Sequence, residues 1–335
     1  MPRHISILFP GQGSQYIGML DDLPTELVES FRSLALEALS FDIIDLIKNG
    51  NEEDLNKTSI TQPAILLTSF IYFKHLQNSI NFKADLMCGH SLGEYSALVA
   101  SNSIALGDAL KLVYQRGLLM EKSLEGSMYA ILNTDIDIIN EFCMKVRDDK
   151  NMIVSTANIN SPKQIVIAGE NKAVETVVSD LKNNGYKKCI KLNVAVASHC
   201  KLMEKASNEF KNLIDKVEIN FPECNIIHNT TASEANNISN LRQNLVSHLI
   251  NPVLWSQSMN YINSLNGIVI ECGPGKVLTG LAKSNGIKNI YTSSSENFFY
   301  DIKSALWQRK TYLYLEHQGA LENQWRSILL KAISM

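Results

Sequence analysis

A short motif, Gly89-His90-Ser91-Leu92-Gly93, joins an apolar run to the start of a helical pattern. A serine between two glycines in a strand-turn-helix context is typical of a nucleophile elbow, whose sharp turn exposes the hydroxyl. The following helix offers backbone N–H groups and its positive dipole to a developing oxyanion. The motif therefore indicates nucleophilic catalysis by Ser91, with a plain helix cap as the structural alternative.

A serine hydroxyl needs a base before it can act as a nucleophile. Of the seven histidines, His199 lies in Val196-Ala197-Ser198-His199-Cys200, directly before a helical pattern and just after a predicted small domain. A cleft is expected where two domains meet, so His199 is a candidate base, although a polar loop histidine would look the same. His90 adjoins Ser91 on the elbow and should point elsewhere, in a supporting role.

Short apolar runs that end in turn residues predict the strands that must hold these groups. Helical spacing between the strands predicts helices packed on a parallel sheet, an α/β arrangement. The expected strands are 5–9, 85–88, 225–228 and 268–272, and the expected helices include 62–79, 97–106 and 108–122.

A second pattern begins near Ser127 and reads strand, helix, strand, strand, helix, strand, the order of a ferredoxin-like unit. Its elements are expected at 128–132, 136–146, 152–157, 164–168, 173–181 and 187–192. The sequence therefore predicts an α/β-hydrolase-like large domain with a parallel sheet and an inserted ferredoxin-like small domain. The expected limits are 1–125 with 195–296 for the large domain, 126–194 for the small domain, and 297–335 for a helical C-terminal extension that ends in the amphipathic stretch 324–333.

Composition narrows the class of protein without naming its function. The chain has 335 residues, 45% hydrophobic and 19% charged, with a net charge of -3. Its basic residues are scattered, which argues against nucleic acid or an anionic membrane surface as a partner. Six cysteines without metal-ligand or paired spacing suggest neither a zinc site nor a disulfide framework. Without a leader-like or membrane-length apolar run, the protein is expected in the cytoplasm, with no metal or other cofactor.

Several separated motifs together resemble the malonyl-CoA:acyl carrier protein transacylase family and the related acyltransferase domains of polyketide synthases. The likeness spans about residues 4 to 296. The motifs, in the order of the family, are Phe9-Pro10-Gly11-Gln12-Gly13-Ser14-Gln15, Thr61-Gln62-Pro63-Ala64, Gly89 to Leu98, Gln115-Arg116-Gly117, Asn160-Ser161-Pro162 with Gln164 to Gly169, Ser198-His199-Cys200 and Gly273 to Leu278.

The resemblance implies a role for each matching residue. Ser91 would be the nucleophile and His199 the base and acid of a Ser-His dyad, with a backbone carbonyl of His248 in place of a carboxylate. Gln12 and the N–H of Leu92 would form the oxyanion hole. The positions implied to bind substrate are Arg116, His90, Gln62, Asn160 and Ser198.

Arg116 is the most specific of these positions. A lone arginine in an amphipathic helix is more often a surface charge. The resemblance implies a buried binding residue instead, because in the family this arginine binds the free carboxylate of malonyl through paired hydrogen bonds. The implied reaction is ping-pong transfer of malonyl from coenzyme A to the phosphopantetheine thiol of an acyl carrier protein, in fatty acid or polyketide synthesis.

Two alternatives stay open at this stage. The small residues Ala197 and Ser198 resemble a motif of methylmalonyl-selective acyltransferases, although Val196 departs from it, and one methyl group decides only about 1–3 kcal/mol of selectivity. A hydrolase that edits carrier-bound acyl groups would use the same serine and histidine, but such relatives usually lack the arginine.

Overall fold

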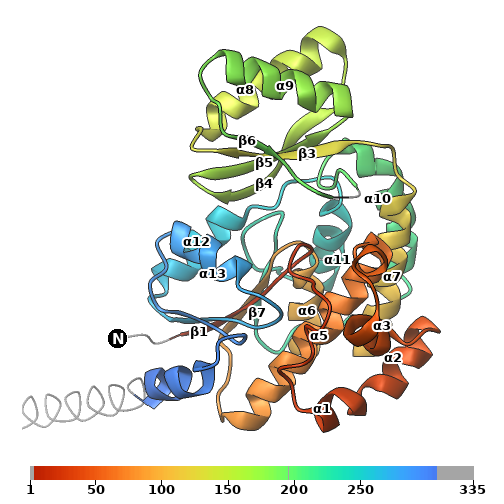
Figure 1. Cartoon of the computed structure of the whole chain (residues 1–335), viewed down its shortest axis with the longest axis vertical. Helices are drawn as coiled ribbons and strands as arrows, with labels where there is room; N and C mark the ends of the chain where they lie inside the picture. The colour runs from red at the N-terminus through yellow and green to blue at the C-terminus, as the bar shows by residue number, and fades with distance from the viewer. Residues whose placement is uncertain (1–3, 195, 308–335) are drawn as a thin grey trace, which may run out of the picture.

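The computed structural model of the chain describes residues 4–194 and 196–307. Two sheets, each with its own helices, form a larger lower part and a smaller upper part (Figure 1). The strands are β1 (Ile5–Phe9), β2 (Leu86–Gly89), β3 (Ser127–Leu132), β4 (Val154–Ser161), β5 (Gln164–Gly169), β6 (Cys189–Lys191), β7 (Asn225–Ile227), β8 (Ile268–Glu271) and β9 (Ile290–Thr292). The helices are α1 (Thr25–Ser30), α2 (Arg32–Leu39), α3 (Ile43–Asn49), α4 (Glu52–Leu55), α5 (Thr58–Ser79), α6 (Gly93–Ala100), α7 (Leu106–Glu121), α8 (Ile136–Lys150), α9 (Asn171–Asn183), α10 (Glu204–Ile214), α11 (Ile238–Ser247), α12 (Trp255–Ser264) and α13 (Val277–Ser284), with a 3-10 turn at Lys201–Met203.

The larger sheet has the strand order β7-β2-β1-β8-β9, and every neighbouring pair is parallel. All five residues of β1 and all four of β2 are buried, because helices cover both faces of the sheet. Since parallel strands end at one edge, the loops after β1, β2 and β7 lie side by side. The predicted parallel sheet is therefore confirmed, and this edge gathers Gln12, Ser91 and Asn229.

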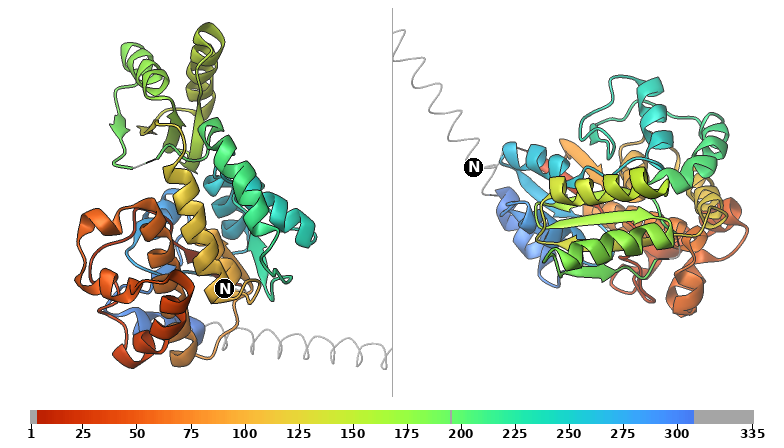
Figure 2. Two further views of the ribbon diagram at one scale, coloured as in Figure 1. Left: turned by 90° about the vertical axis from the view of Figure 1, so that its right-hand side faces the viewer. Right: turned by 90° about the horizontal axis from the view of Figure 1, so that it is seen from above.

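The smaller sheet has the order β4-β5-β3-β6 and is antiparallel. Helices α8 and α9 cover the face turned away from the larger part (Figure 2). Side chains alternate along its strands: Ile131 and Ile165 pack under these helices, whereas Met128 and Val166 belong to the core of the larger part. The predicted ferredoxin-like unit is confirmed.

The two parts are joined by main-chain hydrogen bonds as well as by the chain crossings. Val253, between α11 and α12, pairs with the edge of β4: its N–H donates to Ala157 and its carbonyl accepts from Ile159, both at 2.9 Å. The smaller sheet is thus fixed to a segment only a few residues from His248. The domain limits expected from the sequence stay a prediction.

One expected helix is wrong. The helical pattern at 97–106 is interrupted, since α6 ends at Ala100 and α7 begins at Leu106. Asn102 adopts a left-handed conformation with φ 57°, which asparagine tolerates better than most residues and which cannot continue a right-handed helix. The sequence pattern missed the turn because its apolar residues still fall at helical spacing.

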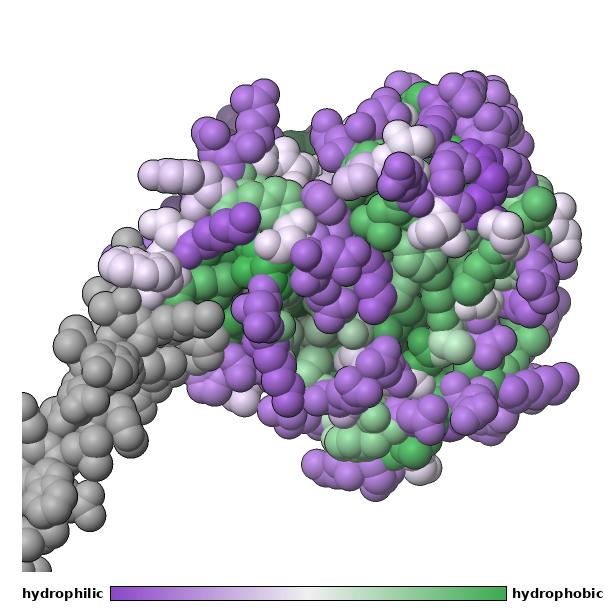
Figure 3. All heavy atoms as spheres, turned by 90° about the horizontal axis from the view of Figure 1, so that it is seen from below, coloured by the Kyte–Doolittle hydropathy of each residue, from purple (hydrophilic) through white to green (hydrophobic). Residues whose placement is uncertain are grey.

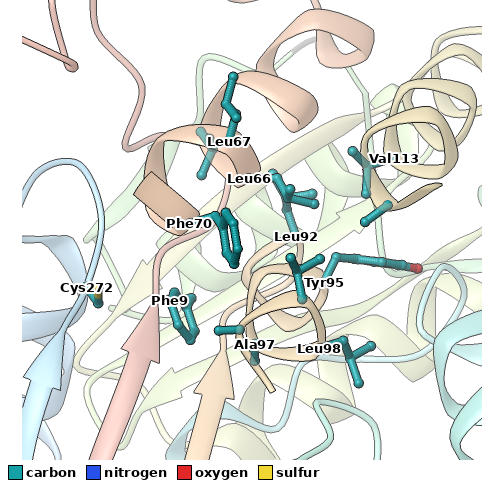
Figure 4. Close-up of a cluster of buried hydrophobic side chains, with 14 of the residues drawn as sticks. Phe9, Leu66, Leu67, Phe70, Leu92, Tyr95, Ala97, Leu98, Val113 and Cys272 are labelled. Atoms are coloured by element: carbon teal, nitrogen blue, oxygen red, sulfur yellow. The ribbon is translucent and has the colours of Figure 1, made fainter. Parts of the chain in front are cut away.

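Helix α6, which follows the elbow, is anchored in the main core (Figure 4). Leu92, which directly precedes α6, and Tyr95 and Leu98 within it belong to a cluster with Phe9 of β1 and with residues of α5 and α7. Every residue of α6 is buried. Such dense packing holds the start of this helix, and with it Ser91, in one place.

At the C-terminal side, residues 298–307 are helical. The rest of the expected extension, including the amphipathic stretch 324–333, lies outside the described residues. Figure 3 shows the face opposite the smaller part, where hydrophilic side chains predominate with hydrophobic ones between them. Within residues 4–194 and 196–307, no helix has the length and apolarity needed to span a membrane.

Candidate active site

The elbow at Ser91 is built by two glycines in contact. A Cβ on Gly89 would lie 1.8 Å from the carbonyl carbon of Gly93, and one on Gly93 would lie 2.1 Å from the oxygen of Phe9. Only glycine permits that approach. Ser91 itself has φ 50°, a left-handed conformation that is uncommon outside glycine and clusters at functional sites.

Ser91 and His199 face each other at the end of the parallel sheet. The Oγ of Ser91 lies 2.9 Å from Nε2 of His199, and Nδ1 of His199 lies 2.8 Å from the carbonyl oxygen of His248. A carbonyl oxygen only accepts, so Nδ1 carries the proton and Nε2 is free to take one from the serine hydroxyl. The contact with a backbone carbonyl is the arrangement that the resemblance implied.

The surroundings of His199 keep its ring neutral. Burial, together with the nearby Arg116 charge, lowers the pKa of His199 to about 3. His199 is 2% exposed, so little water is available to solvate an imidazolium. The histidine is therefore in the form that accepts a proton throughout the neutral range.

A pocket of about 640 Å³ opens between the two parts of the molecule, in front of the dyad. The smaller sheet supplies one wall and the loops after β1 and β2, with α13, supply the others. Of the residues expected to bind or react with substrate, those that line the pocket are Gln12, His90, Ser91, Leu92, Arg116, Asn160, Ser198 and His199. Gln62 is not among the lining residues, and its Oε1 accepts from Nη1 of Arg116, so its expected contact with substrate stays a prediction.

Arg116 reaches the pocket from α7 and is 1% exposed. Its Nη1 donates to Oε1 of Gln62 at 2.8 Å, and its guanidinium carbon lies 5.6 Å from the centre of the Tyr95 ring. Among the described residues, Nε and Nη2 have no hydrogen-bond partner. A buried guanidinium with two open donors is suited to bind an anion, above all a carboxylate.

Gln12 and Leu92, the residues expected to form the oxyanion hole, line the pocket together with Ser91. Leu92 is the first residue after the serine and precedes helix α6, so its N–H points out of the helix start. Nε2 of Gln12 donates one long hydrogen bond, 3.4 Å, to Oγ1 of Thr58, and the second hydrogen of that amide can serve another acceptor.

The remaining expected residues frame the pocket. His90 Nε2 contacts Oδ1 of Asn160 on β4 at 2.8 Å, which joins the elbow to the smaller sheet. Ser198 Oγ lies 3.7 Å from Sδ of Met128 on β3. Each of these pairs bridges the two parts of the molecule, and thus helps to fix the width of the pocket.

Two buried polar residues behind the dyad were missed by the sequence reading, Glu94 and Asn229. Asn229 Oδ1 accepts the N–H of Ser91 at 2.8 Å, and Glu94 contacts Asn229 in turn. A signal for Asn229 was present, since it follows strand β7 at the edge where the loops of a parallel sheet converge.

Comparisons with known proteins show the family and the fold of the chain. Residues 7–296 match the family described as the acyl transferase domain. The malonyl CoA-acyl carrier protein transacylase of Haemophilus influenzae is 38% identical over 290 residues, 84% of this chain and 92% of that protein. A solved transacylase of the same name from Coxiella burnetii has a TM-score of 0.86 at 33% identity, covering 90% of this chain and 96% of the other. A malonyl-transacylase in complex with its type II PKS acyl-carrier protein has a TM-score of 0.82 at 38% identity, covering 86% and 94%.

Proposed function

The chain belongs to the malonyl CoA-acyl carrier protein transacylase family, and we propose from this that Ser91 and His199 carry malonyl from coenzyme A to the pantetheine thiol of an acyl carrier protein. The pocket in front of the dyad receives both thioesters in turn. Six cysteines, all unpaired, support work in the reducing cytoplasm.

In the first half-reaction the proton on Ser91 Oγ passes to Nε2 of His199 as Oγ bonds to the thioester carbon of malonyl-CoA. Negative charge moves to the carbonyl oxygen, where the Leu92 N–H and the Gln12 amide stabilise it. The C–S bond then breaks, and the leaving coenzyme A sulfur takes the proton from His199. The product is malonyl esterified to Ser91.

The second half-reaction runs the same steps in reverse with a different thiol. His199 takes the proton from the carrier's pantetheine thiol, whose sulfur bonds to the ester carbon. The C–O bond to Ser91 breaks and Oγ recovers the proton from His199. Because the histidine is neutral before each step, it can act as base first and acid second in both halves.

The observation that carries the choice of acyl group is Arg116. Its Nε and Nη2 donors are buried without a hydrogen-bond partner among the described residues, and the residue lines the same pocket as the dyad. The free carboxylate of malonyl can accept from both, whereas acetyl would leave the guanidinium desolvated and unpaired. The presence of Arg116 also favours acyl transfer over hydrolysis, because the editing hydrolases related to this family usually lack the arginine.

Acylation with three coenzyme A thioesters tests this proposal. The protein is mixed with malonyl-CoA, methylmalonyl-CoA or acetyl-CoA, and the intact mass is followed over time. We expect malonyl to add fastest, and Arg116→Ala to reduce the preference for malonyl over acetyl about 10- to 100-fold, from about 1.5–3 kcal/mol for charge-assisted hydrogen bonds.

Lys111→Ala is the matched control, because it removes a positive charge from the exposed side of the same helix. Its selectivity should equal that of the unmodified protein. Faster acylation by methylmalonyl-CoA would assign the branched acyl group instead. Equal rates with acetyl and malonyl, unchanged in Arg116→Ala, would contradict the assigned role of the arginine.

A further inference from the structure

A buried polar cluster lies directly behind the elbow, on the side away from the pocket. Glu94 and Asn229 are each 1% exposed, and His228 is wholly buried. Oε1 of Glu94 lies 2.6 Å from Nδ1 of His228, and Oε2 accepts the main-chain N–H of Asn229 at 2.9 Å. A carboxylate is costly to bury, so its place three residues after Ser91 calls for an explanation.

Asn229 connects this carboxylate to the nucleophile. Its Oδ1 accepts the N–H of Ser91 at 2.8 Å. Its Nδ2 donates to the carbonyl of Gly89 at 2.6 Å and to Oε2 of Glu94 at 2.5 Å. Its own carbonyl accepts from the N–H of Leu254 at 2.8 Å. One side chain therefore ties the end of β2, the elbow and α6 together.

Glu94 fixes which way the Asn229 amide points. If that amide turned over, Nδ2 would face the N–H of Ser91, donor against donor, and Oδ1 would face the two acceptors that Nδ2 now serves. The carboxylate accepts from Nδ2 and from the main-chain N–H, so it makes the observed orientation the only satisfied one. The left-handed turn at Ser91 depends on that orientation, because its N–H has no other acceptor within the described part of the chain.

The same carboxylate also lies behind the base. Nδ1 of His248 is 3.9 Å from Oε2 of Glu94, and the His248 ring lies against the His199 ring with centres 4.8 Å apart. The carbonyl of His248 is the acceptor that orients His199. Glu94 therefore stands next to the supports of both members of the dyad.

We propose that Glu94 and Asn229 are positioning residues that hold the Ser91 backbone for attack, an inference that rests on the proposed acyl transfer. Neither touches the pocket, so they act through the elbow. Because Asn229 occupies the N–H of Ser91, the oxyanion is left to the N–H of Leu92 and to Gln12. Without the Asn229 or Glu94 side chain, the Ser91 hydroxyl can leave its aligned position. Arg116, which binds the malonyl carboxylate, stays in place.

Rapid-quench acylation with malonyl-CoA separates this role from simple stability. The final adduct, measured by intact mass, counts the active molecules, and the time course gives the rate constant of those molecules alone. In Glu94→Ala and in Asn229→Ala we expect that rate constant to fall about 10- to 100-fold, because a displacement of about 1 Å has that effect, with half-saturation by malonyl-CoA within about twofold of the unmodified protein.

Glu94→Gln should recover most of the rate. Its amide oxygen can accept the two N–H groups of Asn229, and its NH₂ can face Nδ1 of His228 once the proton of that ring sits on Nε2. Glu170→Ala is the control, since Glu170 also accepts a main-chain N–H, from Ile153 at 3.0 Å, but lies in the smaller part away from the dyad. It should acylate at the unmodified rate.

The inference would be overturned if the active molecules of Glu94→Ala or Asn229→Ala acylated with a rate constant within twofold of the unmodified protein. This holds even if a smaller fraction of the variant were active. Failure of Glu94→Gln to recover would overturn it as well. If one alanine variant does not fold, the other tests the same point. A lack of any adduct in the unmodified protein would instead defeat the proposed function, so the two failures are distinguishable.

Discussion

Ser91 and His199 share an unusual backbone feature: both are in the left-handed region, with φ 50° and 61°. Each such residue costs about 1–3 kcal/mol and persists only where the surroundings impose it. Here those surroundings are the paired glycines of the elbow, the Asn229 side chain and the His248 carbonyl. The dyad is thus held by neighbours that do not line the pocket.

Replacement of His199 tests the base. Asparagine tolerates the left-handed conformation and cannot take the serine proton, so His199→Asn should fold and acylate about 10²- to 10⁴-fold more slowly. The acylation rate is read by intact mass with malonyl-CoA in excess. His4→Ala, a histidine outside the pocket, should behave as the unmodified protein. Acylation at an undiminished rate in His199→Asn would rule out its role as base.

Among the individual residues, those that face the pocket could be predicted from the sequence better than those behind it. Ser91 and Arg116 stand in motifs whose spacing reflects their turn and helix, and the structure brings both to the pocket. Glu94 and Asn229 are 135 positions apart and meet only because β2 and β7 are neighbours in the sheet. A pairing of that kind follows from strand order, which the sequence pattern did not give.

Helices α5 and α7 set the place of Arg116, and their contact depends on one glycine. A Cβ on Gly117 would lie 2.4 Å from Cα of Ser59, which is backbone and cannot move aside cheaply. The motif Gln115-Arg116-Gly117 therefore combines the binding residue with the close helix contact that aims it.

Gly117→Ala should force the two helices apart. We expect a loss of about 1–3 kcal/mol in the free energy of unfolding and weaker discrimination between malonyl and acetyl, because Arg116 is displaced. Gly107→Ala in the same helix is the matched control: its Cβ would meet only Leu34 at 3.8 Å, so it should be neutral or stabilising by about 0.4–1 kcal/mol. Urea unfolding of both variants compares them, and equal stabilities would show that the contact is not tight.

The predicted elements were most accurate where pattern and turn signals agree. The first strand, 5–9, matches β1 at both ends, since its apolar run stops at Pro10-Gly11. The helix expected at 97–106 failed because Ser101, Asn102 and Ser103 form a turn without glycine or proline to mark it. Local hydrogen bonding decided that turn, as in the contact of Ser101 Oγ with the Leu98 carbonyl at 3.1 Å.

For the molecule as a whole, placing the dyad between two parts buries several histidines at once. Burial lowers the pKa of His199 to about 3, and it lowers the pKa values of His90 and His248 below the ordinary 6.5. These rings stay neutral in the folded state, while the unfolded chain takes up protons below pH 6.5. Their contribution to stability is complete above that pH and is lost as the pH falls toward the folded-state values.

The free energy of unfolding should therefore decrease between pH 6.5 and 5, by up to about 1.4 kcal/mol per pH unit from His199, with His90 and His248 acting in the same direction. Urea unfolding at several pH values measures the slope. His199→Asn removes one of the groups and should reduce it. A free energy that stays constant across this range, or the same slope in both proteins, would contradict the neutral buried state of the dyad.

Transfer from the isolated acyl-enzyme would show whether malonyl passes through Ser91 to the carrier. The protein is loaded with malonyl-CoA, separated from free thioester, and mixed with a phosphopantetheinylated acyl carrier protein, while intact masses of both proteins are recorded. We expect the malonyl mass to leave the enzyme and appear on the carrier, and Ser91→Ala never to acquire it. Release of free malonate without a malonylated carrier would show hydrolysis instead of transfer, and an adduct of equal yield in Ser91→Ala would show that Ser91 is not the nucleophile.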